Sequence, residues 1–166
     1  MTITLPSNLT WALSYLGIYF PDSDEDKLKA MGESWGRFAT TMDGLIADAD
    51  RQAQAVKNDN KGEPIGAFWD AWSNANGPAQ ALRANADGAR IIAAGLLTAG
   101  NIVIALKTEV AIQIGIFVRA CWIAAQAAKT PITAVLAVAG VVAVRMIVVA
   151  AIETAINLAL KALLGE

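Results

Sequence analysis

The sequence predicts an all-α protein, in which an antiparallel helical hairpin is extended by long apolar C-terminal helices into a helical bundle. Three observations predict this fold. From Leu28 to Val56, apolar residues recur at steps of three and four, the spacing of a helix that packs along one face. Glycine and proline residues divide the chain near positions 62, 78 and 131. Residues 91–166 are apolar on nearly every helical side, as in helices that are buried all round or lie in a membrane.

The composition limits the functions open to the chain. Its 166 residues suit one domain with a substantial core, and 55% of them are hydrophobic, so a core, a partner or lipid must cover the excess. The net charge is −2 and the basic residues are scattered, which predicts no nucleic-acid partner. Histidine is absent and the single cysteine, Cys121, lies in an apolar run. We therefore expect no catalytic residues, no metal site and no cofactor.

The first expected element is a short N-terminal helix within residues 1–21. Pro6 and Ser7 begin it, with Ser7 as the N-cap, and Gly17 and Pro21 bound its far end. No positively charged segment precedes its apolar stretch, so it does not have the pattern of a secretory signal. We expect it to pack against the helix that follows it in the chain.

Residues 22–107 are expected to form the hairpin. Its first arm begins with acidic residues at 22–26, which complement the helix dipole. The apolar residues that follow make a heptad pattern, suited to antiparallel packing against another helix. Gly32, Gly36 and Gly44 lie off this pattern, and we expect close approach of a second backbone to compensate for them. The predicted helix-packing or partner seam consists of Leu28, Met31, Trp35, Phe38, Met42 and Leu45.

Two interpretations of Trp35 and Phe38 remain open. They are either ordinary core residues of the hairpin or a hot spot for a binding partner. In the second arm, Leu82, Ala86 and Ala89 make a thin stripe of small residues that is suited to lie against them.

The turn of the hairpin is predicted in KNDNKGEPIGAFWDAW, residues 57–72. The polar run through Gly62 is typical of a helix end, and Pro64 fits the first turn of the next helix. Phe68 and Trp72 follow at a spacing of four, on one helical face. A phosphate-binding role for the two glycines lacks both the GxxxxGK[ST] pattern and a preceding strand. The predicted turn motif is Gly62, Pro64, Phe68 and Trp72.

This turn resembles the WXG-type domain of the type VII secretion system, in which a W-x-G-x-x-x-x-x-F run forms the turn. Gly62 and Phe68 match at the right separation, and Asn60 stands where the family has tryptophan. The wider resemblance is to the WXG-like N-terminal domain of actinobacterial polymorphic toxins and channel-protein-like effectors, and it covers residues 5–130 clearly. The matching residues are Leu5, Pro6, Leu9, Trp11, Leu16, Gly17, Pro21, Asp24, Glu25, Asp26, Leu28, Trp35, Ala67, Phe68 and Trp72.

The resemblance implies a non-catalytic helical module for export or delivery and for protein interaction. Its implied partners are a helical WXG-type protein or a second copy, and in related proteins a toxin domain follows downstream. It also implies synthesis in the cytoplasm and export without a cleavable signal peptide, to the medium or the cell surface. The family's Y-x-x-x-D/E export tag follows neither Tyr15 nor Tyr19, so we expect a partner to supply it.

Residues 108–166 are expected to form an apolar helical extension that packs on the hairpin, on a partner or in a membrane. A break at 129–131 divides the extension, and folding back there would bring Lys107 level with Glu153, for which we expect an ion pair. Membrane insertion is marginal, because Arg145 would cost about 2.5–3.5 kcal/mol while each Ile, Leu or Val contributes only about 0.3–0.6.

Two alternatives to the export module therefore remain open. One is a membrane-inserting delivery or pore-forming element that uses residues 91–165. The other is a structural homo-oligomer in which the apolar C-terminal helices form a shared core.

Overall fold

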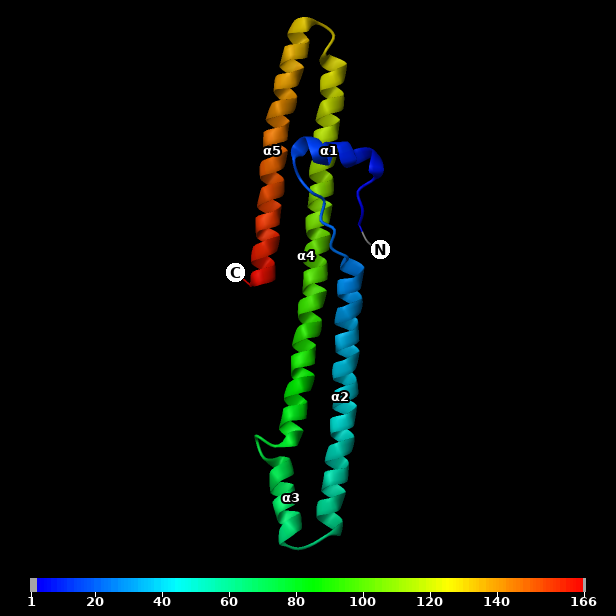
Figure 1. Ribbon diagram of the computed structural model, residues 1–166, viewed down its shortest axis with the longest axis vertical. Helices are drawn as coiled ribbons and strands as arrows, with labels where there is room; N and C mark the ends of the chain where they lie inside the picture. The colour runs from blue at the N-terminus through cyan, green and yellow to red at the C-terminus, as the bar shows by residue number, and fades with distance from the viewer. Residues whose placement is uncertain (1–2, 166) are drawn as a thin grey trace. The chain divides into compact units, whose positions relative to one another are not determined.

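The computed structural model describes residues 3–165, and within that range all regular structure is helical (Figure 1). The predicted all-α class is confirmed. The chain divides into two compact units, Met1–Asp26 with Ala99–Glu166, and Lys27–Thr98. In chain order the elements are a short 3-10 turn η1 (Ser7–Leu9), then α1 (Thr10–Leu16), α2 (Glu25–Asp59), α3 (Glu63–Ser73), α4 (Pro78–Ala127) and α5 (Pro131–Leu164).

Within the 27–98 unit, α2 is the first arm of a hairpin, and α3 with the beginning of α4 makes the second arm (Figure 1). Gly62 carries the turn at a φ of 115°, which favours glycine, and Pro64 lies in the first turn of α3. Gly77 separates α3 from α4, and a Cβ atom there would clash with the carbonyl oxygen of Ala71. The helix breaks lie where the glycine and proline pattern predicted them.

The two arms pack through small residues. After Glu25, the buried residues of α2 recur every seven positions, at Gly32, Ala39, Ile46 and Ala53; three of the four are small, and we call the four the small-residue seam. The facing buried residues of α4 include Ala79, Ala86 and Ala93, also spaced by seven. Small side chains at both surfaces let two helix backbones approach closely.

Gly32 shows how close this approach is. A Cβ atom there would lie 2.9 Å from Cγ of Leu97 and 3.0 Å from the carbonyl oxygen of Ala93. The expectation that a second backbone accounts for the glycines is therefore confirmed at Gly32. It is wrong at Gly36 and Gly44, where an added Cβ would meet no atom within 4 Å.

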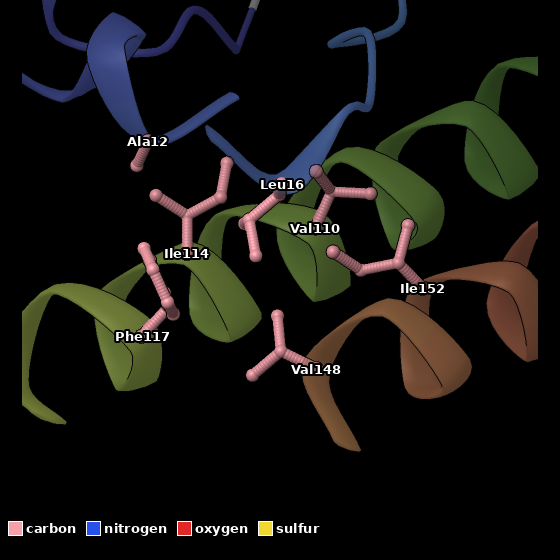
Figure 2. Close-up of a cluster of buried hydrophobic side chains, with 7 residues drawn as sticks. All are labelled: Ala12, Leu16, Val110, Ile114, Phe117, Val148 and Ile152. Carbon is pink, nitrogen blue, oxygen red and sulfur yellow. The ribbon is translucent and has the colours of Figure 1, made fainter. Parts of the chain in front are cut away.

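The other unit is built around the α4–α5 pair, with α1 lying across it (Figure 1). Figure 2 shows side chains from all three helices converging in one core, where seven residues are at most 2% exposed. The rings of Trp11 and Tyr15 also lie near Phe117, at centroid separations of 6.1 and 5.4 Å. The core consists of Ala12, Leu16, Val110, Ile114, Phe117, Val148 and Ile152.

The expectation that the N-terminal helix packs against the next helix in the chain is therefore wrong. α1 packs instead on α4 and α5, because these two helices offer the larger apolar surface. Gly17 ends α1 in the left-handed conformation, with φ at 74°, as its predicted position at the helix end requires.

α5 begins after the predicted break and is largely exposed. Thr130 and Thr133 form a capping box, and Pro131 lies in the first turn. Two helical stretches, within residues 63–127 and 131–164, are long and apolar enough to cross a membrane. Only 11% of the most apolar window of α5 is buried, so most of its apolar surface is not covered by the chain itself.

Candidate interaction surfaces

The six predicted seam residues lie on the side of α2 next to the small-residue seam. Leu28 and Met42 are half-buried, while the others are 51%, 37%, 47% and 59% exposed in chain order. Trp35 and Phe38 meet edge to face at 5.8 Å and, with Ser34, line a shallow surface hollow. We call the four exposed residues the α2 stripe: Met31, Trp35, Phe38 and Leu45.

The small-residue seam was missed in the sequence because large side chains dominate a hydropathy pattern. α2 carries two apolar stripes side by side, and the one with less apolar volume is the one buried within the chain. The signal that would have found it is the seven-residue spacing of Ala39, Ile46 and Ala53, matched by that of Ala79, Ala86 and Ala93.

Ion pairs lie on the other flank of the same helix pair. Asp43 of α2 pairs with Arg90 of α4, and one heptad further on Asp50 pairs with Arg83. Hydrogen bonding with Asp43 raises the pKa of Arg90, with a smaller contribution from Asp87. Positions 43 and 50 lie on the opposite side of the seam from positions 35 and 38, given 100° per residue. The hairpin thus has one charged flank and one apolar flank.

The four turn-motif residues lie at the closed end of this hairpin and have different environments. Gly62 and Pro64 are exposed at the turn, and Phe68 is 38% exposed. Trp72 is half-buried and donates its indole N–H to Oδ1 of Asp50 at 3.0 Å, which joins α3 to α2. The structure therefore gives Trp72 a hydrogen-bonding role between the two arms.

Trp69 adds a second aromatic contact that was not singled out in the sequence. The ammonium of Lys57 lies 4.0 Å from its ring centroid, at cation–π distance. Trp69 and Trp72, with Asp50 and Arg83, line a cavity of about 310 Å³.

A buried ion pair lies in the unit that contains α1 and α5. Lys107 Nζ is 2.7 Å from Oε2 of Glu25, and it also donates to the carbonyl oxygen of Ser23 at 2.5 Å. Glu25 accepts a further hydrogen bond from the backbone N–H of Ile3, and the two charged residues are 0% and 2% exposed. The hydrogen bond from Lys107, then that from Ile3, lowers the pKa of Glu25 to about 2.

The expected Lys107–Glu153 ion pair is therefore wrong. Lys107 is held by Glu25, and Glu153 is exposed. Glu25 lies at the first position of α2, where an acidic residue already complements the helix dipole, so its local pattern does not indicate a distant partner.

Among residues 3–165, no group of three or more histidine, cysteine, aspartate or glutamate side chains is arranged to hold a metal ion. The surfaces that remain are the apolar α2 stripe, the aromatic hairpin end and the exposed face of α5. Their chemistry is that of protein or lipid contact.

Comparison with known proteins agrees with this helical architecture. The family described as "WXG100 like domain" matches residues 2–154. No curated protein and no solved structure matched the chain. The family match covers nearly the whole chain, and all regular structure in the described residues is helical. The chain belongs to the WXG100-like family of helical proteins associated with type VII secretion.

Proposed function

We propose that this chain is a non-catalytic export and interaction module of a type VII secretion substrate, and that a helical partner recognises it through the α2 stripe. Family membership supports the link to secretion. On this proposal the chain is made in the cytoplasm and leaves the cell without a cleavable signal peptide. In related proteins, the corresponding domain would deliver a toxin domain that follows it.

The observation that carries the proposal is that α2 buries its small residues within the chain and leaves its large aromatic residues exposed. Small residues such as Ala39 and Ala53 are buried within the hairpin, whereas Trp35 and Phe38 stay 37% and 47% exposed. Clustered tryptophan and phenylalanine side chains are enriched at protein interfaces, and an apolar helical face fits a groove or a second amphipathic helix. The charged flank with Asp43 and Arg90 would remain in solvent when a partner covers the stripe.

Secretion is the direct test. The chain, carrying an epitope tag, is expressed in cells with an intact type VII machinery and in matched cells whose secretion ATPase is inactive. We expect the protein in the medium or on the cell surface only in the first strain. Equal export from both strains, with a cytoplasmic marker retained in both, would contradict the proposal.

A second candidate function is membrane insertion of the α4–α5 hairpin. The exposed apolar surface of α5 favours it, since Ile132, Val135 and Leu136 near the hairpin tip are 66–76% exposed. Arg119 and Arg145 oppose it, because each would enter the bilayer with a charge. Flotation with liposomes tests this candidate: recovery of the protein with vesicles after a carbonate wash supports insertion, and recovery in the soluble fraction contradicts it.

A further inference from the structure

α5 carries a second apolar face, opposite the one that enters the core. Val148 and Ile152 are buried against α1 and α4. On the far side of the helix, exposed apolar residues recur at steps of three and four, the spacing of a coiled-coil seam. We call this face the outer seam: Ile132, Val135, Ala139, Val142 and Met146, of which Ile132, Val135 and Met146 are 76%, 70% and 68% exposed.

The outer seam has a defined end. Continuing the alternation of three and four past Met146 leads to Val149, which is half-buried against the core, and then to Glu153, which is charged. The exposed apolar part therefore covers residues 132–146, a length of about 22 Å at 1.5 Å per residue.

The apolar area on this face suits a protein interface. Large aliphatic side chains expose on the order of 100 Å² each when uncovered. Six of them lie on the outer seam or beside it, so together they offer about 600 Å², the lower end of the roughly 600–1,000 Å² that each partner contributes to a standard interface. The six are Ile132, Val135, Leu136, Val138, Val142 and Met146.

Charge favours a second copy in the antiparallel orientation. The seam positions are of two kinds, those reached by a step of four (139 and 146) and those reached by a step of three (135 and 142). In an antiparallel two-fold pair, each kind lies beside the other kind, so Ala139 lies beside Val142 of the second copy, and Val135 beside its Met146. The same register brings Lys129 level with Glu153 of the second copy, at both ends of the contact. Lys129 and Glu153 are exposed, and neither forms an ion pair among residues 3–165. A parallel pair would instead bring the two Glu153 side chains together.

We propose that two copies of this chain associate through the outer seam of α5, as an antiparallel two-fold pair centred between Gly140 and Val141. The small Ala139 lets the two helices approach closely at the centre, and Lys129–Glu153 pairs close the two ends. This interface is distinct from the α2 stripe and does not depend on secretion.

The mass of the whole chain in detergent-free solution, measured by analytical ultracentrifugation over a concentration series, tests the association. We expect a dimer, and Met146→Glu should raise its dissociation constant about tenfold or more, because it buries a charge in the apolar contact. Leu158→Glu is the matched control, since Leu158 is 63% exposed on α5 but lies off the outer seam. The proposal would be overturned by a monomer at every concentration or by an equal effect of the two variants. It would also be overturned if the protein were recovered only with lipid vesicles in the flotation experiment described above.

Cross-linking tests the register. In a Cys121→Ser background, chains with Ala139→Cys are mixed with chains carrying Val142→Cys under mild oxidation. We expect the mixed 139–142 disulfide to exceed either homodimeric disulfide. Lys129→Glu should weaken the dimer, and adding Glu153→Lys should restore it. Dominant 139–139 cross-links, or no restoration by the double reversal, would overturn the antiparallel arrangement.

Discussion

Lys107 and Glu25 form a buried salt bridge, with Nζ and Oε2 2.7 Å apart and a separation of 82 positions in the chain. The pair joins α4 to the first residue of α2. Lys107 also binds the carbonyl oxygen of Ser23, so one ammonium group fixes both the start of α2 and the backbone that leads into it. The N-terminal segment is thus held to α4 by charge as well as by the apolar contacts of α1.

Acid should loosen this attachment in a defined pH range. The pKa of Glu25 is lowered from 4.5 to about 2, so its contribution to stability is complete above about pH 4.5 and is lost as the pH falls towards 2. We expect the urea midpoint of unfolding, followed by circular dichroism, to fall across this range. Glu25→Gln should flatten the dependence, because glutamine does not titrate. A wild-type and a variant curve of equal slope would contradict a role for Glu25.

Removing one charge of the pair should cost more than removing both. Lys107→Met leaves a buried carboxylate without its cation, whereas Lys107→Met with Glu25→Leu leaves no buried charge. We therefore expect the single variant to have a lower melting temperature than the double variant. The opposite order would mean that Glu25 stabilises the fold even without Lys107, through its hydrogen bond from the backbone N–H of Ile3.

The glycines of α2 should differ in their tolerance of alanine. Gly32→Ala places a Cβ atom 3.0 Å from the carbonyl oxygen of Ala93, and overpacking of this kind costs about 1–3 kcal/mol. Gly36→Ala meets open space and should stabilise the helix by about 0.5–1 kcal/mol. Chemical denaturation of the two variants measures both values. Equal effects would contradict the close packing of α2 on α4.

Phe117 should be the most sensitive position of the α1–α4–α5 core. It is fully buried beneath Trp11 and Tyr15, so Phe117→Ala is expected to lower the free energy of unfolding by about 3–5 kcal/mol. Trp122→Ala, at a 64% exposed site of the same helix, should change it by no more than about 0.5 kcal/mol. Similar losses in the two variants would argue against the core shown in Figure 2.

The helix breaks could be predicted from the sequence because they depend on local conformation. Gly62 and Pro131 mark their turns through backbone preferences that need no knowledge of the rest of the chain. The contacts between helices could not be predicted in the same way. Periodicity showed that α2 has an apolar face, but it did not show which of two neighbouring stripes α4 covers. The partner of Lys107 depends on a segment 82 residues away, which no local pattern reveals.

On the proposed function, the α2 stripe serves a partner and not the fold of this chain. The decisive measurement compares two proteins. One is the double variant Trp35→Ala/Phe38→Ala, and the other is Ile91→Ala, which removes a 73% exposed side chain from the same unit. We expect both proteins to keep a cooperative helical unfolding transition, and only the Trp35/Phe38 variant to lose export by cells with an intact type VII machinery. Normal export of that variant, or its failure to fold while the Ile91 variant folds, would contradict the account.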